Sequence, residues 1–279
     1  MKRIIIILGI ACISASAIVQ TSFGQQISGT VFEMNSEIPV EYVSIGIIGK
    51  NTGTVADQNG NYTLKINPEY HSDTLKFSCI GYHSYSVKVS DFINLNNGNV
   101  SLEKRIFDLA EVVVRPRTIK QKTLGNTPRN QFMNACLPDS LGYELGVLIS
   151  NKKTSFIKEV NVDVTRCTYD TAFFRINIYQ VHKKRKNDFE NILSAPIYFS
   201  MSKEEVKDKI TVDLRHLNLV VKGDYLVTVE HVKDLGPGRI CFSCGLLFAN
   251  TSYGRSTSQG TWGKWPIGIG LSVEVDVVN

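Results

Sequence analysis

The sequence predicts an all-β protein made of two β-sandwiches. Short segments in which apolar and polar residues alternate recur along almost the whole chain, as expected of strands that bury one face. Asn, Asp, Gly and Pro separate these segments at short intervals, which is typical of turns between strands. The chain has 279 residues, 43% hydrophobic and 20% charged. This is the composition of a folded protein, and the length suits about two domains.

Residues 1–24 have the three-part pattern of a secretory signal peptide. Lys2 and Arg3 precede an uncharged apolar stretch, and small residues follow up to Gly24. We expect cleavage after Gly24, with cleavage after Ala17, a retained anchor or a lipidated Cys12 as alternatives. The mature protein is then exported to the periplasm, the outer membrane or the cell surface, and the rest of the sequence predicts no membrane-spanning helix.

Residues 25–103 are expected to form the first sandwich. The predicted strands are 27–31, 42–48, 54–56, 62–66, 73–78 and 85–89. Asp57 to Gly60 is a predicted turn, because an Asp side chain can bond nearby backbone and Gly allows positive φ. Strands this short and this closely spaced favour a sandwich.

The same region resembles the carboxypeptidase regulatory-like domain, which has a transthyretin-like β-sandwich. The residues that carry the resemblance are Ile27, Gly29, Val31, Pro39, Val43, Gly53, Thr54, Asp57, Gly60, Tyr62, Ile80, Gly81 and Tyr82. In zinc carboxypeptidases this sandwich is an accessory to the catalytic domain. The zinc-binding patterns HxxE and HExxH are absent from this chain, so the resemblance implies no peptidase activity.

Residues 104–128 are predicted to be a connector strand and a basic linker. The segment 109–114 resembles the strand that joins this sandwich to the plug of TonB-dependent outer-membrane transporters. A transporter barrel has about 22 strands, which residues 129–279 are too few to form, so we expect the front end of a transporter without its barrel. Pro116 and several Lys and Arg residues follow. They indicate a solvated tether, or alternatively a docking site for an acidic partner.

Residues 129–279 are predicted to form a jelly-roll-like second sandwich. Apolar residues alternate over 145–149, 160–164, 174–178, 210–214, 225–229 and 271–277, and 240–248 is a continuous apolar strand. Each alternating strand should have one buried face and one face in water. Residues 202–207 are the one expected helical turn, capped by Ser202 and Glu205.

Cysteine chemistry is expected to be structural. Five cysteines remain after the signal peptide, among them Cys241 and Cys244 in CxxC spacing. Residues three apart on a strand face opposite sides, which is poor geometry for chelating a metal. We therefore expect buried free cysteines or one ordinary disulfide, and neither a metal nor a cofactor.

The candidate ligand-binding residues are Tyr253, Arg255, Trp262 and Trp265. They lie beside Gly254, Gly260 and Gly263 in a stretch rich in Ser and Thr. Aromatic faces stack on sugar rings, and Arg donates paired hydrogen bonds. The alternative is that both tryptophans cap the core, since Trp is highly buried on average. The basic run 182–186 is interpreted as a solvated hairpin loop, or alternatively as a site for an anionic surface or glycan.

We expect a non-catalytic cell-envelope protein that binds a protein partner or a glycan. Nucleic acid is excluded as a partner, because the net charge is only +5 and falls to +3 without Lys2 and Arg3. The alternative is a hydrolase with an unrecognised active site in the second sandwich. No catalytic motif or carboxylate pair stands out, but a triad or carboxylate pair converging in one cleft would favour the hydrolase.

Overall fold

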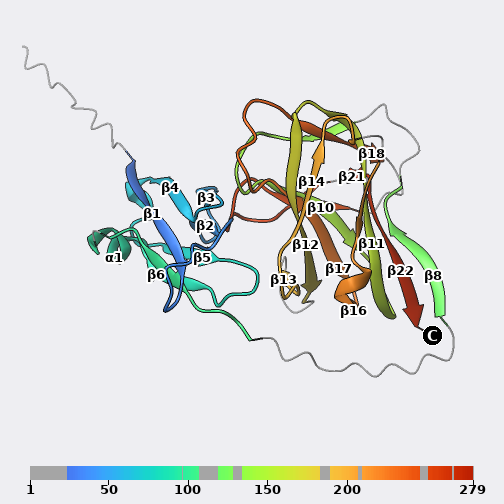
Figure 1. The fold of residues 1–279 in the computed structure, drawn as a ribbon, viewed down its shortest axis with the longest axis horizontal. Helices are drawn as coiled ribbons and strands as arrows, with labels where there is room; N and C mark the ends of the chain where they lie inside the picture. The colour runs from blue at the N-terminus through green and yellow to red at the C-terminus, as the bar shows by residue number, and fades with distance from the viewer. Residues whose placement is uncertain are drawn as a thin grey trace, which may run out of the picture.

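The computed structural model describes residues 24–95, 97–106, 119–127, 134–182, 189–206, 209–245, 251–265 and 267–278. It is all-β, with two sandwiches that lie side by side (Figure 1). Three expected features lie outside the described residues: the signal peptide up to 23, the connector strand 109–114 and the basic run 183–186. None of the described helices is long and apolar enough to cross a membrane.

The N-terminal sandwich consists of two small sheets around one core. One sheet has the order β4-β1-β7 and the other β3-β2-β5-β6. Their strands are β1 (Gln25–Glu33), β2 (Ser44–Ile47), β3 (Gly53–Val55), β4 (Asn61–Ile66), β5 (Thr74–Ser78), β6 (Tyr85–Lys88) and β7 (Val100–Leu102). Alternation explains β4, where Tyr62, Leu64 and Ile66 are buried and the residues between them are exposed. The six strands predicted for this region are confirmed.

The predicted turn before β4 is confirmed in detail. The carboxylate Oδ1 of Asp57 accepts hydrogen bonds from the backbone N–H groups of Asn59 and Asn61, both at 2.8 Å. Gly60 has φ +73°, and a Cβ there would lie 2.5 Å from the carbonyl oxygen of Val31. The position therefore requires glycine on both counts.

The C-terminal sandwich has a seven-stranded sheet and an eight-stranded sheet. The first has the order β13-β12-β17-β10-β19-β20, with β14 on β12; the second has the order β21-β18-β11-β22-β8, with β15 and β16 on β11 and β9 on β18. Their strands are β8 (Ile119–Gly125), β9 (Asn134–Leu137), β10 (Glu144–Ile149), β11 (Thr154–Cys167), β12 (Thr171–Val181), β13 (Phe189–Asn191), β14 (Ile197–Ser202), β15 (Lys209–Asp213), β16 (Val220–Lys222), β17 (Tyr225–Glu230), β18 (Ile240–Gly245), β19 (Ser252–Arg255), β20 (Gly263–Trp265), β21 (Gly268–Ile269) and β22 (Leu271–Val278). Consecutive strands repeatedly cross between the sheets, as in a jelly roll.

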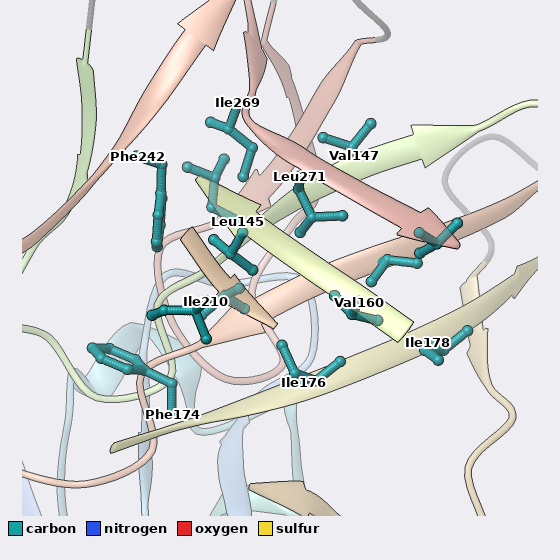
Figure 2. Packing of buried hydrophobic residues seen from close by; sticks show 14 of the residues in the cluster. Leu145, Val147, Val160, Phe174, Ile176, Ile178, Ile210, Phe242, Ile269 and Leu271 are labelled. Atoms are coloured by element: carbon teal, nitrogen blue, oxygen red, sulfur yellow. The ribbon is translucent and has the colours of Figure 1, made fainter. Parts of the chain in front are cut away.

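The main core lies between these two sheets. Figure 2 shows Leu145 and Val147 of β10 and Ile176 and Ile178 of β12 packed against residues of the facing sheet such as Val160. These are the apolar positions of the alternating segments, so the predicted inward face of each strand is confirmed. A separate cluster forms the core of the N-terminal sandwich.

Three elements differ from the sequence-based expectation. Residues 119–125, assigned to the linker, form β8 and pair with β22 along its whole length. Helix α1 (Val89–Asn94) buries Val89 and Phe92 against the N-terminal core, and the sequence did not predict it. Residues 203–205 form only a turn, in which the backbone N–H of Ser202 donates to the Glu205 carboxylate at 2.8 Å.

One disulfide joins the two strands β9 and β18. Cys136 and Cys241 face each other in register and are bonded, whereas Cys244 is a free cysteine in the hydrophobic core. Of the two arrangements expected, the structure has one disulfide together with free cysteines. The two cysteines are 105 residues apart in the sequence, so the disulfide closes a long loop within the C-terminal sandwich.

Candidate functional site

The two sandwiches are joined by a loop of the C-terminal sandwich that lies on the N-terminal one. This docking loop, residues 256–261, connects β19 and β20. Its Gln259 carbonyl accepts from the backbone N–H of Gly49 at 2.9 Å, and the Gln259 side chain donates to Ser78 at 2.8 Å. A Cβ on Gly46 or Gly53 would lie within 2.4 Å of the Ser258 carbonyl oxygen. These glycines therefore allow the close approach of the loop.

Beside the docking loop, four charged residues form a row across the seven-stranded sheet. Strand register places Arg175 of β12 opposite Glu230 of β17, Glu230 opposite Glu144 of β10, and Glu144 opposite Arg255 of β19. We call this row the charge ladder. It lies on the outer face of the sheet, opposite to the apolar core positions. The N-terminal sandwich covers one end, because Arg175 donates to the Tyr42 carbonyl at 2.9 Å.

The oxygens of both ladder carboxylates are occupied by hydrogen bonds. Glu230 accepts from Arg175 at 2.8 Å, from Asn177 at 2.7 Å and from Ser44 at 3.4 Å. Neither carboxylate is exposed, and the Arg175 side chain is 3% exposed. Glu144 is bonded in the same way by four residues of three strands: Arg255 at 2.7 Å, Tyr179 at 2.8 Å, Asn177 at 2.9 Å, and Thr228.

The environment displaces the pKa values of the two carboxylates in opposite directions. Burial, reinforced by the negative charge of Glu230, raises the pKa of Glu144 against the opposing effect of Arg255. Burial also acts to raise the pKa of Glu230, but the charges of Arg175 and Arg255 outweigh it and hold that pKa below the ordinary value. Two guanidinium groups, those of Arg175 and Arg255, lower the pKa of Glu230, whereas Arg255 is the one cation that lowers the pKa of Glu144, which explains the difference between the two.

A cleft of about 730 Å³ lies between the sandwiches, beside the charge ladder. Lys76, Ser78 and Cys79 belong to its N-terminal wall; Arg175, Asn177, Tyr179, Phe189, Glu230, Arg255 and Trp262 belong to its C-terminal wall. Burial raises the pKa of the Cys79 thiol to about 11. The thiol is therefore protonated at neutral pH and is a poor nucleophile.

The C-terminal wall of the cleft is aromatic. Trp262 meets Phe189 and Tyr179 edge to face, with ring centroids 5.3 Å and 5.6 Å apart. The Arg255 guanidinium carbon lies 4.9 Å from the centre of the Trp262 ring, which is a cation–π contact. Arg255 thus links the charge ladder to the aromatic wall, and both meet the same cleft.

The structure brings together three of the four candidate residues. Arg255 and Trp262 line the cleft, and Tyr253 supports the wall by packing against Phe189 at 5.4 Å between ring centroids. Trp265, on β20, is 37% exposed and is not part of the lining. Neither tryptophan belongs to one of the buried hydrophobic clusters of the described residues.

Sequence reasoning missed the charge ladder. Glu144, Arg175, Asn177 and Glu230 occupy the polar positions of alternating strands, and those faces were expected to be in water. The expectation is wrong for this sheet, because all four are buried. A usable signal was that β12 carries Arg175, Asn177 and Tyr179 at successive outward positions, a combination of large polar side chains that can form a network.

Within the described residues there is no group of three or more His, Cys, Asp or Glu side chains placed to hold a metal ion.

The interface also contains an apolar patch. Tyr42 of the N-terminal sandwich packs against Phe173 in a tilted arrangement and against Tyr198 edge to face, at centroid distances of 5.3 Å and 5.2 Å; both of these residues belong to the C-terminal sandwich. The two sandwiches are therefore held by apolar as well as polar contacts.

Fold and site together define a two-sandwich all-β protein with a charged, partly aromatic cleft between its domains. Residues 27–114 match the family model described as the CarboxypepD_reg-like domain. The N-terminal sandwich is therefore a carboxypeptidase regulatory-like domain, as the sequence resemblance predicted. A comparison with curated protein sequences finds no match.

Among solved structures, the chain is similar to the cysteine protease and lectin-like domains of Cwp84, a surface layer associated protein of Clostridium difficile. The identity is 10%, the match covers 92% of this chain and 59% of that one, and the TM-score is 0.34. A structure of infectious bursal disease virus Gx strain matches at 9% identity, 91% and 63% coverage and TM-score 0.23. The chain thus spans less than two thirds of each of these structures.

Proposed function

We propose that this is a non-catalytic binding protein of the cell envelope whose ligand, a glycan, lies in the cleft between the two sandwiches. The observation that carries the proposal is the cleft wall, where Trp262 is half-buried, stacked on Arg255 and open to the cleft. An aromatic face with neighbouring guanidinium and amide donors can stack on a sugar ring and bond its hydroxyls. A protein partner that inserts a side chain into the same cleft is the alternative ligand.

Trp262 lines the cleft and Trp265 does not, so the two tryptophans provide a test variant and a matched control. The mature chain, residues 25–279, is applied to an immobilised panel of neutral and acidic oligosaccharides, alongside Trp262→Ala and Trp265→Ala. Stacking of a nucleic-acid base on an aromatic side chain contributes about 1–3 kcal/mol, and with this value taken as the analogue for a sugar ring, Trp262→Ala should weaken glycan binding by about 5- to 150-fold. Trp265→Ala is the matched control, since Trp265 lies outside the cleft lining and should leave binding unchanged.

Thermal unfolding of both variants separates a binding defect from a folding defect. If Trp262→Ala lowers the melting temperature of the protein strongly, the tryptophan is a structural residue and the binding role is rejected. The same conclusion follows if the wild-type chain binds no member of the panel, or if the two variants bind equally well.

A hydrolase is the second candidate, and one observation favours it. Glu144 and Glu230 lie opposite each other with pKa values displaced in opposite directions, which is a pattern of acid–base pairs. Against it, neither side chain is exposed and their oxygens are occupied by hydrogen bonds. A reducing-end assay on the bound oligosaccharides decides: release of new reducing ends by the wild type but not by Glu230→Gln would favour the hydrolase.

The envelope location rests on the signal-like segment and on the disulfide. Disulfides persist in oxidising compartments such as the periplasm and the cell surface, and Cys136 and Cys241 are bonded. N-terminal sequencing of the protein purified from the envelope should begin at or near Gln25. A chain that begins at Met1 would overturn this part of the proposal.

A further inference from the structure

We propose that the cleft selects an acidic sugar, whose carboxylate lies between Lys76 of the N-terminal sandwich and Arg255 of the C-terminal sandwich while its ring lies against Trp262. This inference rests on the proposed function and specifies the chemical class of the ligand. It also makes the ligand a bridge, because its two cationic contacts come from different domains.

Lys76 is the first observation behind the inference. It lies on β5, its side chain lines the cleft, and it is half-buried. Within the described part of the chain it has neither a hydrogen-bond acceptor nor an ion-pair partner. Burial and then the positive charge of Arg255 lower the pKa of Lys76. The two cations are thus close enough to repel each other, and an anion between them would relieve that repulsion.

Arg255 is the second observation. Its Nε and Nη2 atoms bind Glu144, at 2.8 Å and 2.7 Å. Its Nη1 atom has no hydrogen-bond partner among the described residues, and the side chain is 11% exposed and lines the cleft. Because Glu144 and the Trp262 ring hold the guanidinium in place, Arg255 presents a fixed donor to the cleft.

The carboxylates of the cleft wall are already engaged, so none of them can neutralise Lys76. The lining contains Glu190 and Glu230. Glu190 lies 2.9 Å from His182 at the rim, and Glu230 binds Arg175. The cleft therefore has an excess of positive charge around Lys76, which an anionic ligand would balance.

The rest of the lining favours a sugar over an apolar acid. The amides of Asn191 and Gln259 lie around the same space, each with one hydrogen bond from its NH₂ group to a neighbouring side chain, and Trp262 offers the stacking face. Amides can bond hydroxyl groups as donors and as acceptors. A carboxylate on a hydroxyl-bearing ring is the chemistry that uses the cations, the amides and the aromatic face together.

The test uses two ligands of equal length that differ only in charge. Binding of trigalacturonic acid and of its carboxyl-reduced neutral counterpart is measured by calorimetry for the mature chain, for Lys76→Met and for Lys65→Met. Met preserves the apolar stem of Lys, and Lys65, exposed on β4, is the matched control. The wild type should bind the acid about tenfold more tightly than the neutral trisaccharide, as expected for one charge-assisted contact.

Lys76→Met should lower this preference, because it removes one of the two cationic contacts, whereas Lys65→Met should keep it. Equal affinity of the wild type for both trisaccharides would overturn the inference and leave glycan binding in the cleft intact. A preference that Lys76→Met leaves unchanged would also overturn it. Absence of binding to either trisaccharide overturns it too, and the wider oligosaccharide panel then decides the proposed function separately.

Discussion

Replacing Arg175 by methionine tests whether the charge ladder depends on its cationic end. Arg175 makes two hydrogen bonds to Glu230, at 2.8 and 3.0 Å, and also bonds Tyr42 and Ser44 of the other domain at 2.9 and 2.8 Å. Met has a similar length but no charge and no donor. The substitution leaves the Glu230 carboxylate buried without its counter-ion, and it removes two contacts between the domains.

The expected cost is large because the site excludes water. Breaking a buried ion pair by removing one partner costs about 3–5 kcal/mol in free energy of unfolding. With a urea m-value of about 1–3 kcal/mol per M, the unfolding midpoint should fall by at least about 1 M. Tryptophan fluorescence reports on the C-terminal sandwich, because Trp262 and Trp265 both lie there.

The double substitution Arg175→Met with Glu230→Leu supplies the decisive comparison. It removes both charges, and replacing a buried ion pair by apolar residues is often close to neutral. The double variant should therefore be more stable than Arg175→Met alone. The reasoning is refuted if Arg175→Met costs less than about 1 kcal/mol, or if the second substitution lowers the stability further by its full individual amount.

Three further predictions concern the pH dependence, the disulfide and strand β8. Because the pKa of Glu230 is lowered in the folded state, its ionised form stabilises the fold above its unfolded pKa of about 4.3 and the contribution is lost as pH falls. Glu144, whose pKa is raised, contributes stability below that pH and loses it as pH rises. In urea titrations from pH 3 to 7, the loss of stability caused by Glu230→Gln relative to wild type should grow as pH rises, and the loss caused by Glu144→Gln should shrink. A change of both losses in the same direction with pH would contradict this. Replacing both disulfide cysteines by alanine should lower the unfolding free energy by about 2–5 kcal/mol, measured by urea titration against the wild type, and peptide mapping without reductant should recover the linked pair. Leu124→Ala should lower the unfolding free energy by about 1–2 kcal/mol in the same titration, since this half-buried side chain packs on the core. Ile119→Ala should lower it much less, because the Ile119 side chain is 53% exposed. Equal losses for the two variants would indicate that residues 119–125 belong to the linker and not to the sandwich.

Some of the architecture was accessible from the sequence because it depends on local chemistry. The alternation of Tyr62, Leu64 and Ile66 predicted both a strand and its inward face, since side chains on a strand point to opposite sides in turn. The turn at Asp57 and Gly60 was predictable for the same kind of reason. Its carboxylate bonds the next few backbone amides, and its glycine adopts a conformation that other residues avoid.

Strand β8 shows where local information ends. Its residues are mostly exposed, two of them are Lys, and their pattern is that of a solvated segment. They form a strand because β22, about 150 residues later in the sequence, offers an unpaired edge in the folded sandwich. A pairing that distant leaves little trace in the sequence of either partner.

The sequence by itself determined the alternating strands, their inward faces and the N-terminal domain family, and it predicted Arg255 and Trp262 as candidate ligand-binding residues. Only the tertiary structure decided that the outward face of the seven-stranded sheet lies against a second domain. The alternation of apolar and polar residues in a strand indicates which side chains point away from the core, but it does not indicate whether they face water or pack against another sandwich. Arg175, Glu144 and Glu230 look like ordinary solvated positions in the sequence, and they became a buried charge ladder because a docking loop and two glycines let the domains close over them.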